Sequence, residues 1–163
     1  TRLPYKMHSE YLRKLFLNNE LVQGKFKVNK EQIALHDVSV PIFAVSTVKD
    51  HIAPWKSVYK IHLFTESDVT FVLTSGGHNA GIVSEPGHPH RNFQMLTHQH
   101  ENKYLTPKKW LEKAPSYEGS WWTEWQQWLT NNSSDKVAAP PLGNSKNGYP
   151  IVCDAPGTYV LEK

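Results

Sequence analysis

Two short apolar runs, separated by a segment of helical periodicity, constrain the fold more than any other feature of the sequence. Residues 40–45 and 69–73 are rich in β-branched and aromatic residues and predict strands that are buried on both faces. Between them, Pro54 suits a first helical turn, and apolar residues recur at helical spacing over 54–66. A strand, a helix and a second strand in this order predict two parallel strands joined by a crossover helix, and therefore an α/β fold.

A residue with catalytic potential follows each of these predicted strands. Asp50 comes shortly after the first strand, and His78 follows the second within a Gly-Gly-His turn. Because parallel strands end at the same edge of a sheet, we expect both side chains at that edge, where open α/β sheets bind ligands. In catalysis by a nucleophile, a histidine and an acid, the carboxylate orients the imidazole, and the imidazole takes the proton of the nucleophile. The α/β-hydrolase order is nucleophile, acid and histidine, so this pair predicts a nucleophile earlier in the polypeptide.

A purely structural role stays open for both residues. Aspartates that follow strands often cap a helix, and a Gly-Gly-His segment can serve only as a turn. The sequence contains no Gly-x-Ser-x-Gly motif or comparable nucleophile elbow. Its one cysteine, Cys153, comes after the acid and the histidine and has no adjacent positive residue to activate a thiolate, so we interpret it as structural.

Other patterns divide the chain into three parts. We predict a cap-like helix and hairpin over residues 1–36, the C-terminal part of the α/β core over 37–131, and a loosely packed tail over 132–163. The individual elements expected outside the crossover unit are a helix over 5–19, a hairpin over 21–35, a strand over 92–96, and helices over 107–113 and 120–130.

Composition narrows the class of function. The net charge of +3 is spread along the chain without a block of basic residues, which argues against nucleic-acid binding. The sequence contains no run of about 18 apolar residues, so it predicts no membrane span. A single cysteine cannot form an internal disulfide, and we therefore expect a cytoplasmic protein. The chain opens with Thr1-Arg2-Leu3-Pro4 and no methionine, and we expect it to be a segment of a longer protein.

Four histidines form two His-x-His pairs, namely His88, His90, His98 and His100. Imidazoles are common transition-metal ligands, so a zinc site is one interpretation of this pattern. No cysteine or fixed acidic partner accompanies the pairs, and Pro89 indicates a surface loop. We therefore expect neither a metal nor another cofactor.

The predicted helix over 120–130 carries four tryptophans, which are Trp121, Trp122, Trp125 and Trp128. They cover more than one face of the helix, so some rings are exposed unless another segment covers them. We favour packing of the helix onto the sheet. The alternative is contact with a polymer or a partner subunit, because large exposed apolar patches usually mark binding surfaces.

The motifs around the acid and the histidine are specific enough to identify a family. Residues 49–55 (Lys-Asp-His-Ile-Ala-Pro-Trp) and 75–81 (Ser-Gly-Gly-His-Asn-Ala-Gly) resemble the acid and histidine motifs of class I polyhydroxyalkanoate synthases. Residues 7–13, 119–125 and 155–160 resemble, in the same order along the chain, the segment before the acid motif, the late tryptophan helix and the terminus of that family. The resemblance spans nearly the whole chain and points to the C-terminal part of the catalytic domain.

This resemblance implies an α/β-hydrolase-like domain that polymerises (R)-3-hydroxyacyl-coenzyme A into polyester and releases coenzyme A. The nucleophile of the family is a cysteine, whose elbow is missing here, so the chain alone is expected to be inactive. His78 is implied to be the general base, and Asp50 either orients His78 or helps to activate the hydroxyl of the incoming unit. Within the same motifs, His51, Trp55 and Asn79 are candidates for substrate binding or support of the site.

The resemblance also bears on partners and on rival functions. The expected partners are the hydroxyacyl-coenzyme A substrate and the polyester product, the expected location is the cytoplasm at a polyester-granule surface, and a homodimer of the full-length enzyme stays open. An esterase or depolymerase of the same fold shares the acid and histidine, and a serine in the upstream elbow would favour that reading. A granule-binding module without catalysis is the third interpretation.

Overall fold

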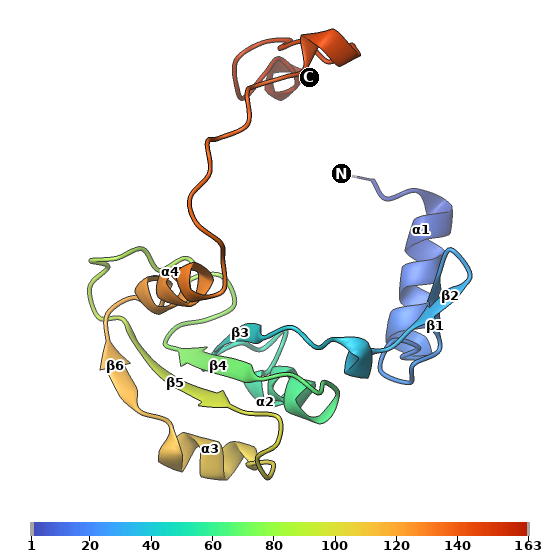
Figure 1. The fold of residues 1–163 in the computed structure, drawn as a ribbon. Helices are drawn as coiled ribbons and strands as arrows, with labels where there is room; N and C mark the ends of the chain where they lie inside the picture. The colour runs from blue at the N-terminus through green and yellow to red at the C-terminus, as the bar shows by residue number, and fades with distance from the viewer. Residues whose placement is uncertain (1, 163) are drawn as a thin grey trace. The chain divides into compact units, whose positions relative to one another are not determined.

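The computed structural model describes residues 2–162, which form two compact units, one ending at Asn131 and the other starting at Asn132 (Figure 1). The first unit contains a four-stranded sheet in the order β3-β4-β5-β6. Its strands are β3 (Ile42–Thr47), β4 (Val69–Thr74), β5 (Asn92–His98) and β6 (Ser116–Glu118).

The two strands predicted from the apolar runs are present and parallel. Register runs from Ile42 opposite Val69 to Thr47 opposite Thr74, so both strands end at the same edge of the sheet. All six residues of β4 are buried, as expected for a strand covered on both faces. The same expectation is wrong for β3, whose apolar residues 42–45 are only partly buried because β3 is at the edge of this sheet. The mixed α/β class is thus confirmed.

An arrangement of parallel strands and crossover helices describes only part of the sheet. β5 runs antiparallel to β4, and β6 runs antiparallel to β5. No helix lies between β4 and β5 along the described chain, and the segment between β5 and β6 contains only one short helix, over residues 107–113, so each strand runs back beside its neighbour.

The crossover segment is helical but shorter and tighter than predicted. It consists of α2 (Trp55–Val58) and a 3-10 helix, η3 (Tyr59–Leu63), in place of one helix over 54–66. Side chains three residues apart eclipse in a 3-10 helix, and the rings of Tyr59 and His62 accordingly lie 4.4 Å apart between centroids. The two rings are tilted by 47°, and both lie beside Phe71 of β4.

Two apolar clusters flank β4, because its successive side chains point to opposite faces of the sheet. Phe71 and Leu73 pack with Tyr59 and with Trp110 of α3 (Pro107–Lys113). On the other face, Val72 packs in a second cluster, whose other buried members are Phe93 and Trp121. Trp121 precedes α4 (Trp122–Asn131), and α3 and α4 lie on opposite sides of the sheet (Figure 1).

The predicted N-terminal helix and hairpin are both confirmed. α1 (Tyr5–Glu10) continues into a π-helix, η1 (Tyr11–Leu17), and β1 (Phe26–Val28) pairs with β2 (Glu31–Ile33). Asn29 and Lys30 join the two strands with φ values of 49° and 74°, the left-handed conformation of a type I′ turn. A short 3-10 helix, η2 (Leu35–Asp37), follows β2.

The second unit contains little regular structure. It has two 3-10 helices, η4 (Ser145–Asn147) and η5 (Tyr159–Leu161), and an isolated bridge between Asn144 and Tyr149. Cys153 is exposed there, so packing gives no support to its interpretation as a structural residue. No helix among residues 2–162 is both long and apolar enough to cross a membrane.

Candidate active site

The loops that follow β3 and β4 are held together by backbone hydrogen bonds beyond the ends of the strands. Val48 N–H donates to the carbonyl of Thr74, and Lys49 N–H donates to the carbonyl of Gly76, both at 3.0 Å. The parallel ladder therefore extends to Lys49, directly before Asp50, and to Gly76, two residues before His78. This extension fixes the two loops relative to each other.

Asp50 and His78 meet at this edge of the sheet. His78 Nδ1 lies 2.9 Å from Asp50 Oδ2. The pKa of Asp50 lies below its ordinary value, chiefly because the N–H of Ala53 bonds the carboxylate and next because His78 does. An ionised carboxylate only accepts hydrogen bonds, so His78 donates from Nδ1, and in the neutral form of this tautomer Nε2 carries the lone pair of a general base.

Asp50 uses its two oxygens for different tasks. Oδ1 accepts from the N–H of Ile52 at 2.9 Å and of Ala53 at 2.8 Å, while Oδ2 accepts from His78. The helix-capping role considered for this residue is not what the structure shows, because α2 has Pro54 as its N-cap and no side-chain cap bond; Asp50 instead closes the turn before that helix. The carboxylate is 8% exposed and His78 is 43% exposed, so the acid is enclosed and the base is accessible.

Two glycines give the histidine loop its close approach to β3. Gly76 has a φ of 105°, which side-chain-bearing residues rarely adopt. A Cβ on Gly81 would lie 2.5 Å from Thr47 Cγ2 and 2.7 Å from the carbonyl oxygen of Ser75. The sequence pattern predicted only a tight turn. The glycine at position 81 is the signal in the sequence for the close approach of this loop to Thr47.

Of the three supporting candidates, Trp55 and Asn79 have structural roles, and His51 is exposed. Trp55 packs against the first apolar cluster, with its ring 6.2 Å from Tyr59 and 6.4 Å from Trp110. The carbonyl of Asn79 accepts from the N–H groups of Ile82 and Val83, which closes the histidine turn. His51 is exposed beside Asp50. Substrate binding by these residues stays a prediction.

Comparison with curated proteins shows which proteins the whole chain resembles. The chain is 39% identical to the poly(3-hydroxyalkanoate) polymerase subunit PhaC of Rhizobium etli, 36% to the poly(3-hydroxyalkanoate) polymerase of Methylorubrum extorquens and 34% to the PhaC subunit of Cupriavidus necator. Each alignment covers the whole of this chain. The chain is similar to poly(3-hydroxyalkanoate) polymerases along its entire length. The resemblance found in the motifs is thereby confirmed.

These polymerases are much longer than this chain, which spans about a quarter of their length, between 25% and 27% for the three named. No family model matches the sequence. The similarity to the polymerases therefore concerns a part of each of them, and the aligned residues of this chain include Asp50 and His78.

The four histidines of the His-x-His pairs do not converge. His88 bonds Glu85 at 2.9 Å, and the ring of His98 lies 5.6 Å from that of His62. His100 instead approaches Asp68 and Glu101, at 3.4 Å and 3.3 Å. These three form the only group within residues 2–162 with ligand atoms close enough for a metal, and all three side chains are at least 43% exposed. The paired pattern therefore does not form one site.

The tryptophans mostly pack, as the favoured interpretation predicted. Trp121 is 6% exposed and stacks on Phe43 of β3, while the ring of Trp128 lies 5.5 Å from the same phenylalanine. Trp125 is 41% exposed. With Trp122, it lines an apolar hollow of about 380 Å³.

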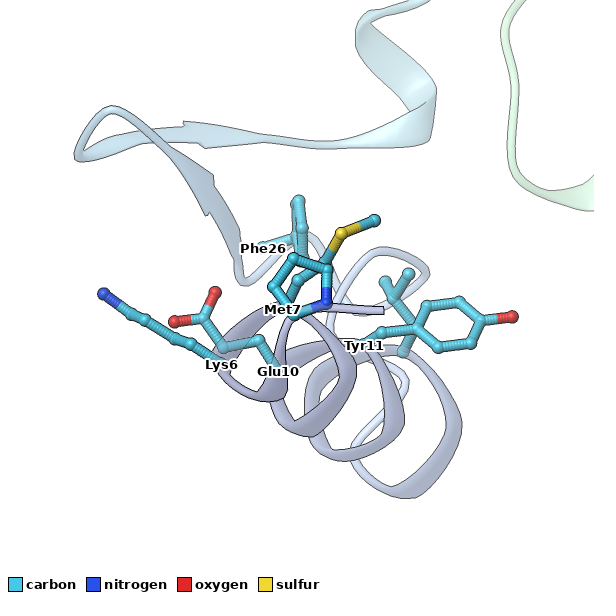
Figure 2. A pocket seen from close by; sticks show the side chains of 7 residues that line it. Lys6, Met7, Glu10, Tyr11 and Phe26 are labelled. Atoms are coloured by element: carbon cyan, nitrogen blue, oxygen red, sulfur yellow. The ribbon is translucent and has the colours of Figure 1, made fainter. Parts of the chain in front are cut away.

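A second apolar hollow lies in the N-terminal part, away from the acid and histidine motifs in the chain. It measures about 500 Å³, and Figure 2 shows Met7 and Tyr11 on the helix with Phe26 reaching over from the hairpin. Neither Asp50 nor His78 is among its lining residues.

Proposed function

We propose that this chain supplies the general base and the acid of a poly(3-hydroxyalkanoate) polymerase, within an α/β-hydrolase-like domain. The observation that carries the proposal is the 2.9 Å contact of His78 Nδ1 with Asp50 Oδ2 at the end of two parallel strands. The relatives, which are named for polymerising 3-hydroxyalkanoates, support the substrate class. The substrate is then a 3-hydroxyacyl thioester of coenzyme A, and the product is a polyester.

The proposed chemistry needs a thiol that comes from polypeptide outside these 163 residues. His78 Nε2 takes the thiol proton, the thiolate attacks the thioester carbonyl, and the bond to the sulfur of coenzyme A breaks. The leaving thiolate receives the proton from His78. In the next step His78 takes the proton of a hydroxyl on another hydroxyacyl unit, and that oxygen attacks the enzyme-bound acyl group to form the ester. The bond between the acyl group and the enzyme sulfur breaks, and the released thiolate regains the proton from His78.

Asp50 acts in this scheme by orienting His78 and stabilising the imidazolium. Both carboxylate oxygens already accept hydrogen bonds, from two backbone N–H groups and from the imidazole. The carboxylate is also 8% exposed, which leaves little room for a substrate hydroxyl. The geometry therefore favours orientation of the base over direct activation of the incoming hydroxyl.

The remaining assignments belong to the same proposal. Residues 37–131 form part of the catalytic core, residues 1–36 are a cap-like region, and residues 132–163 are a tail. The complete polymerase acts in the cytoplasm at the surface of polyester granules. His51 and Asn79, which flank the acid and the base, support substrate binding from exposed positions.

The test uses a complete polymerase in which this chain replaces the matching quarter of the Rhizobium etli relative. Release of coenzyme A from 3-hydroxybutyryl-coenzyme A is measured for Asp50→Asn and His78→Gln, and polymer is weighed. Asp50→Asn leaves His78 in the wrong tautomer, and His78→Gln removes the base itself. We expect each change to lower kcat by about 10⁴-fold. The isolated chain of 163 residues is expected to release no coenzyme A above background.

His88→Gln is the matched control. His88 Nδ1 also lies 2.9 Å from a carboxylate oxygen, that of Glu85, but further along the same loop. Its removal should leave kcat within about twofold, because a surface ion pair contributes little. Asp50→Asn and His78→Gln proteins that fold and keep more than a tenth of the activity would refute the proposal. Hydrolysis of the thioester without polymer would favour the esterase interpretation.

A further inference from the structure

We propose that Trp121 and Trp122 are positioning residues, whose indole N–H groups hold the loop that carries His78. Trp121 Nε1 donates to the carbonyl of Gly81 at 3.1 Å, and Trp122 Nε1 donates to the carbonyl of Ile82 at 2.9 Å. Two successive indoles thus bond two successive carbonyls. The inference rests on the proposed function, since it assigns these residues to the same base.

The carbonyls that accept these bonds belong to the turn around His78. Gly81 N–H donates to the carbonyl of Gly77 at 3.0 Å, and the carbonyl of Asn79 accepts from Ile82 and Val83. His78 lies between Gly77 and Gly81, which the first of these bonds joins, and directly before Asn79. A displacement of residues 81 and 82 would therefore move the imidazole relative to Asp50.

A third bond joins the same two segments. Ser120 Oγ–H donates to the carbonyl of Ser84, and Ser120 Oγ accepts from the N–H of Trp122. Both serines are buried. Residues 120–122 therefore hold the loop at three carbonyls, those of residues 81, 82 and 84, and Figure 1 shows the segment between β4 and β5 passing beside α4.

Trp121 is itself fixed to the strand that precedes the acid. The ring of Trp121 stacks on Phe43 of β3 at 6.3 Å between centroids, and it is buried in the second cluster with Val72 and Phe93. Asp50 follows β3 along the chain. The indole of Trp121 thus connects the histidine loop to the face of the sheet on which Phe43 of β3 lies. A rigid link of this kind maintains the geometry of a catalytic pair.

Packing alone is the competing explanation, and a phenylalanine separates the two. Trp122→Phe removes the donor to Ile82 and keeps an aromatic ring on a half-buried position. Trp125→Phe is the matched control, because this ring is in the same helix and 41% exposed but is not a donor to the loop carbonyls. Ser120→Ala is a second test variant that removes the bond to Ser84 with little change in volume.

The first measurement needs no catalysis. In the 163-residue chain labelled with ¹⁵N-histidine, NMR follows the exchange of the His78 Nδ1 proton with water. We expect Trp122→Phe and Ser120→Ala to accelerate this exchange at least about tenfold while the urea unfolding transition stays cooperative. Trp125→Phe should leave the exchange unchanged.

The second measurement is kinetic and uses the complete chimeric polymerase. Misplacement of a catalytic group lowers kcat, so we expect Trp122→Phe to reduce kcat by about ten- to a hundredfold with little change in KM. Folded Trp122→Phe and Ser120→Ala proteins with unchanged proton exchange and unchanged kcat would overturn the inference. If Asp50→Asn and His78→Gln keep their activity, the proposed function fails, and the proton exchange still decides whether the indoles fix His78.

Discussion

The glycines around His78 predict opposite outcomes for two similar substitutions. A Cβ on Gly81 would lie 2.5 Å from Thr47 Cγ2, 3.0 Å from Thr47 Cβ and 2.7 Å from the carbonyl oxygen of Ser75. A Cβ on Gly77 would meet only the carbonyl oxygen of Lys49, at 4.0 Å. We therefore expect Gly81→Ala to destabilise the protein and Gly77→Ala to be tolerated.

The size of the effect follows from what surrounds the added methyl group. Carbon atoms pack at about 3.5–4.0 Å, so the methyl on residue 81 must displace its neighbours by roughly 1 Å. Thr47 is 0% exposed and the second obstacle is a backbone oxygen, so neither can turn away into solvent. Overpacking of this kind costs about 1–3 kcal/mol, and we place Gly81→Ala at about 3 kcal/mol. Gly77→Ala should cost nothing or stabilise by about 0.5 kcal/mol, through a less flexible unfolded chain.

Urea unfolding followed by tryptophan fluorescence measures both changes. With a slope of about 1–3 kcal/mol per molar urea, Gly81→Ala should lower the midpoint by at least about 1 M, while Gly77→Ala leaves it in place. Thr47→Ser removes one of the three obstacles, so the double variant should recover part of the loss. Equal midpoints for Gly81→Ala and Gly77→Ala would refute the packing argument.

Two further predictions concern the stability of the first unit. Burial, and next the nearby His98, lower the pKa of His62 from 6.5 to about 4, so the unfolded state binds a proton first. The free energy of unfolding should therefore fall by about 1–2 kcal/mol, after allowance for partial exposure, as the pH drops from about 6.5 to about 4. His62→Leu should remove this part of the pH dependence in urea titrations, and an unchanged slope would contradict it. Thr106 Oγ1 accepts from the N–H of Lys109 at the start of α3, so Thr106→Ala should cost about 1 kcal/mol by thermal unfolding, whereas Thr106→Ser should cost much less.

The part of the fold that carries the candidate site could be predicted because its signals are local. The apolar runs of β3 and β4 both form strands, of which β4 is buried throughout and β3 partly, and a helical segment between them favours a parallel pair. The edge of the sheet then places Asp50 beside His78, and the observed contact between them agrees with that expectation. Their catalytic role stays a prediction.

The remainder depends on contacts between distant residues, which a single sequence does not reveal. The antiparallel direction of β5 and β6 is set by how the loops return across the sheet. The crossover is one turn of α2 and a 3-10 helix, because the packing of Tyr59 overrides the periodicity that favoured a longer helix. The bond from Trp122 to Ile82 joins residues 40 positions apart, and nothing in the local pattern distinguishes it from simple packing.

The unequal enclosure of Asp50 and His78 has a consequence for which molecules can reach the pair. A reagent that modifies imidazoles meets an open ring, whereas one that modifies carboxylates meets a group that the fold has nearly sealed. Reactants of different sizes can therefore exchange protons with the His78 ring. Asp50, which sets the tautomer of that ring, does not have to move to admit them.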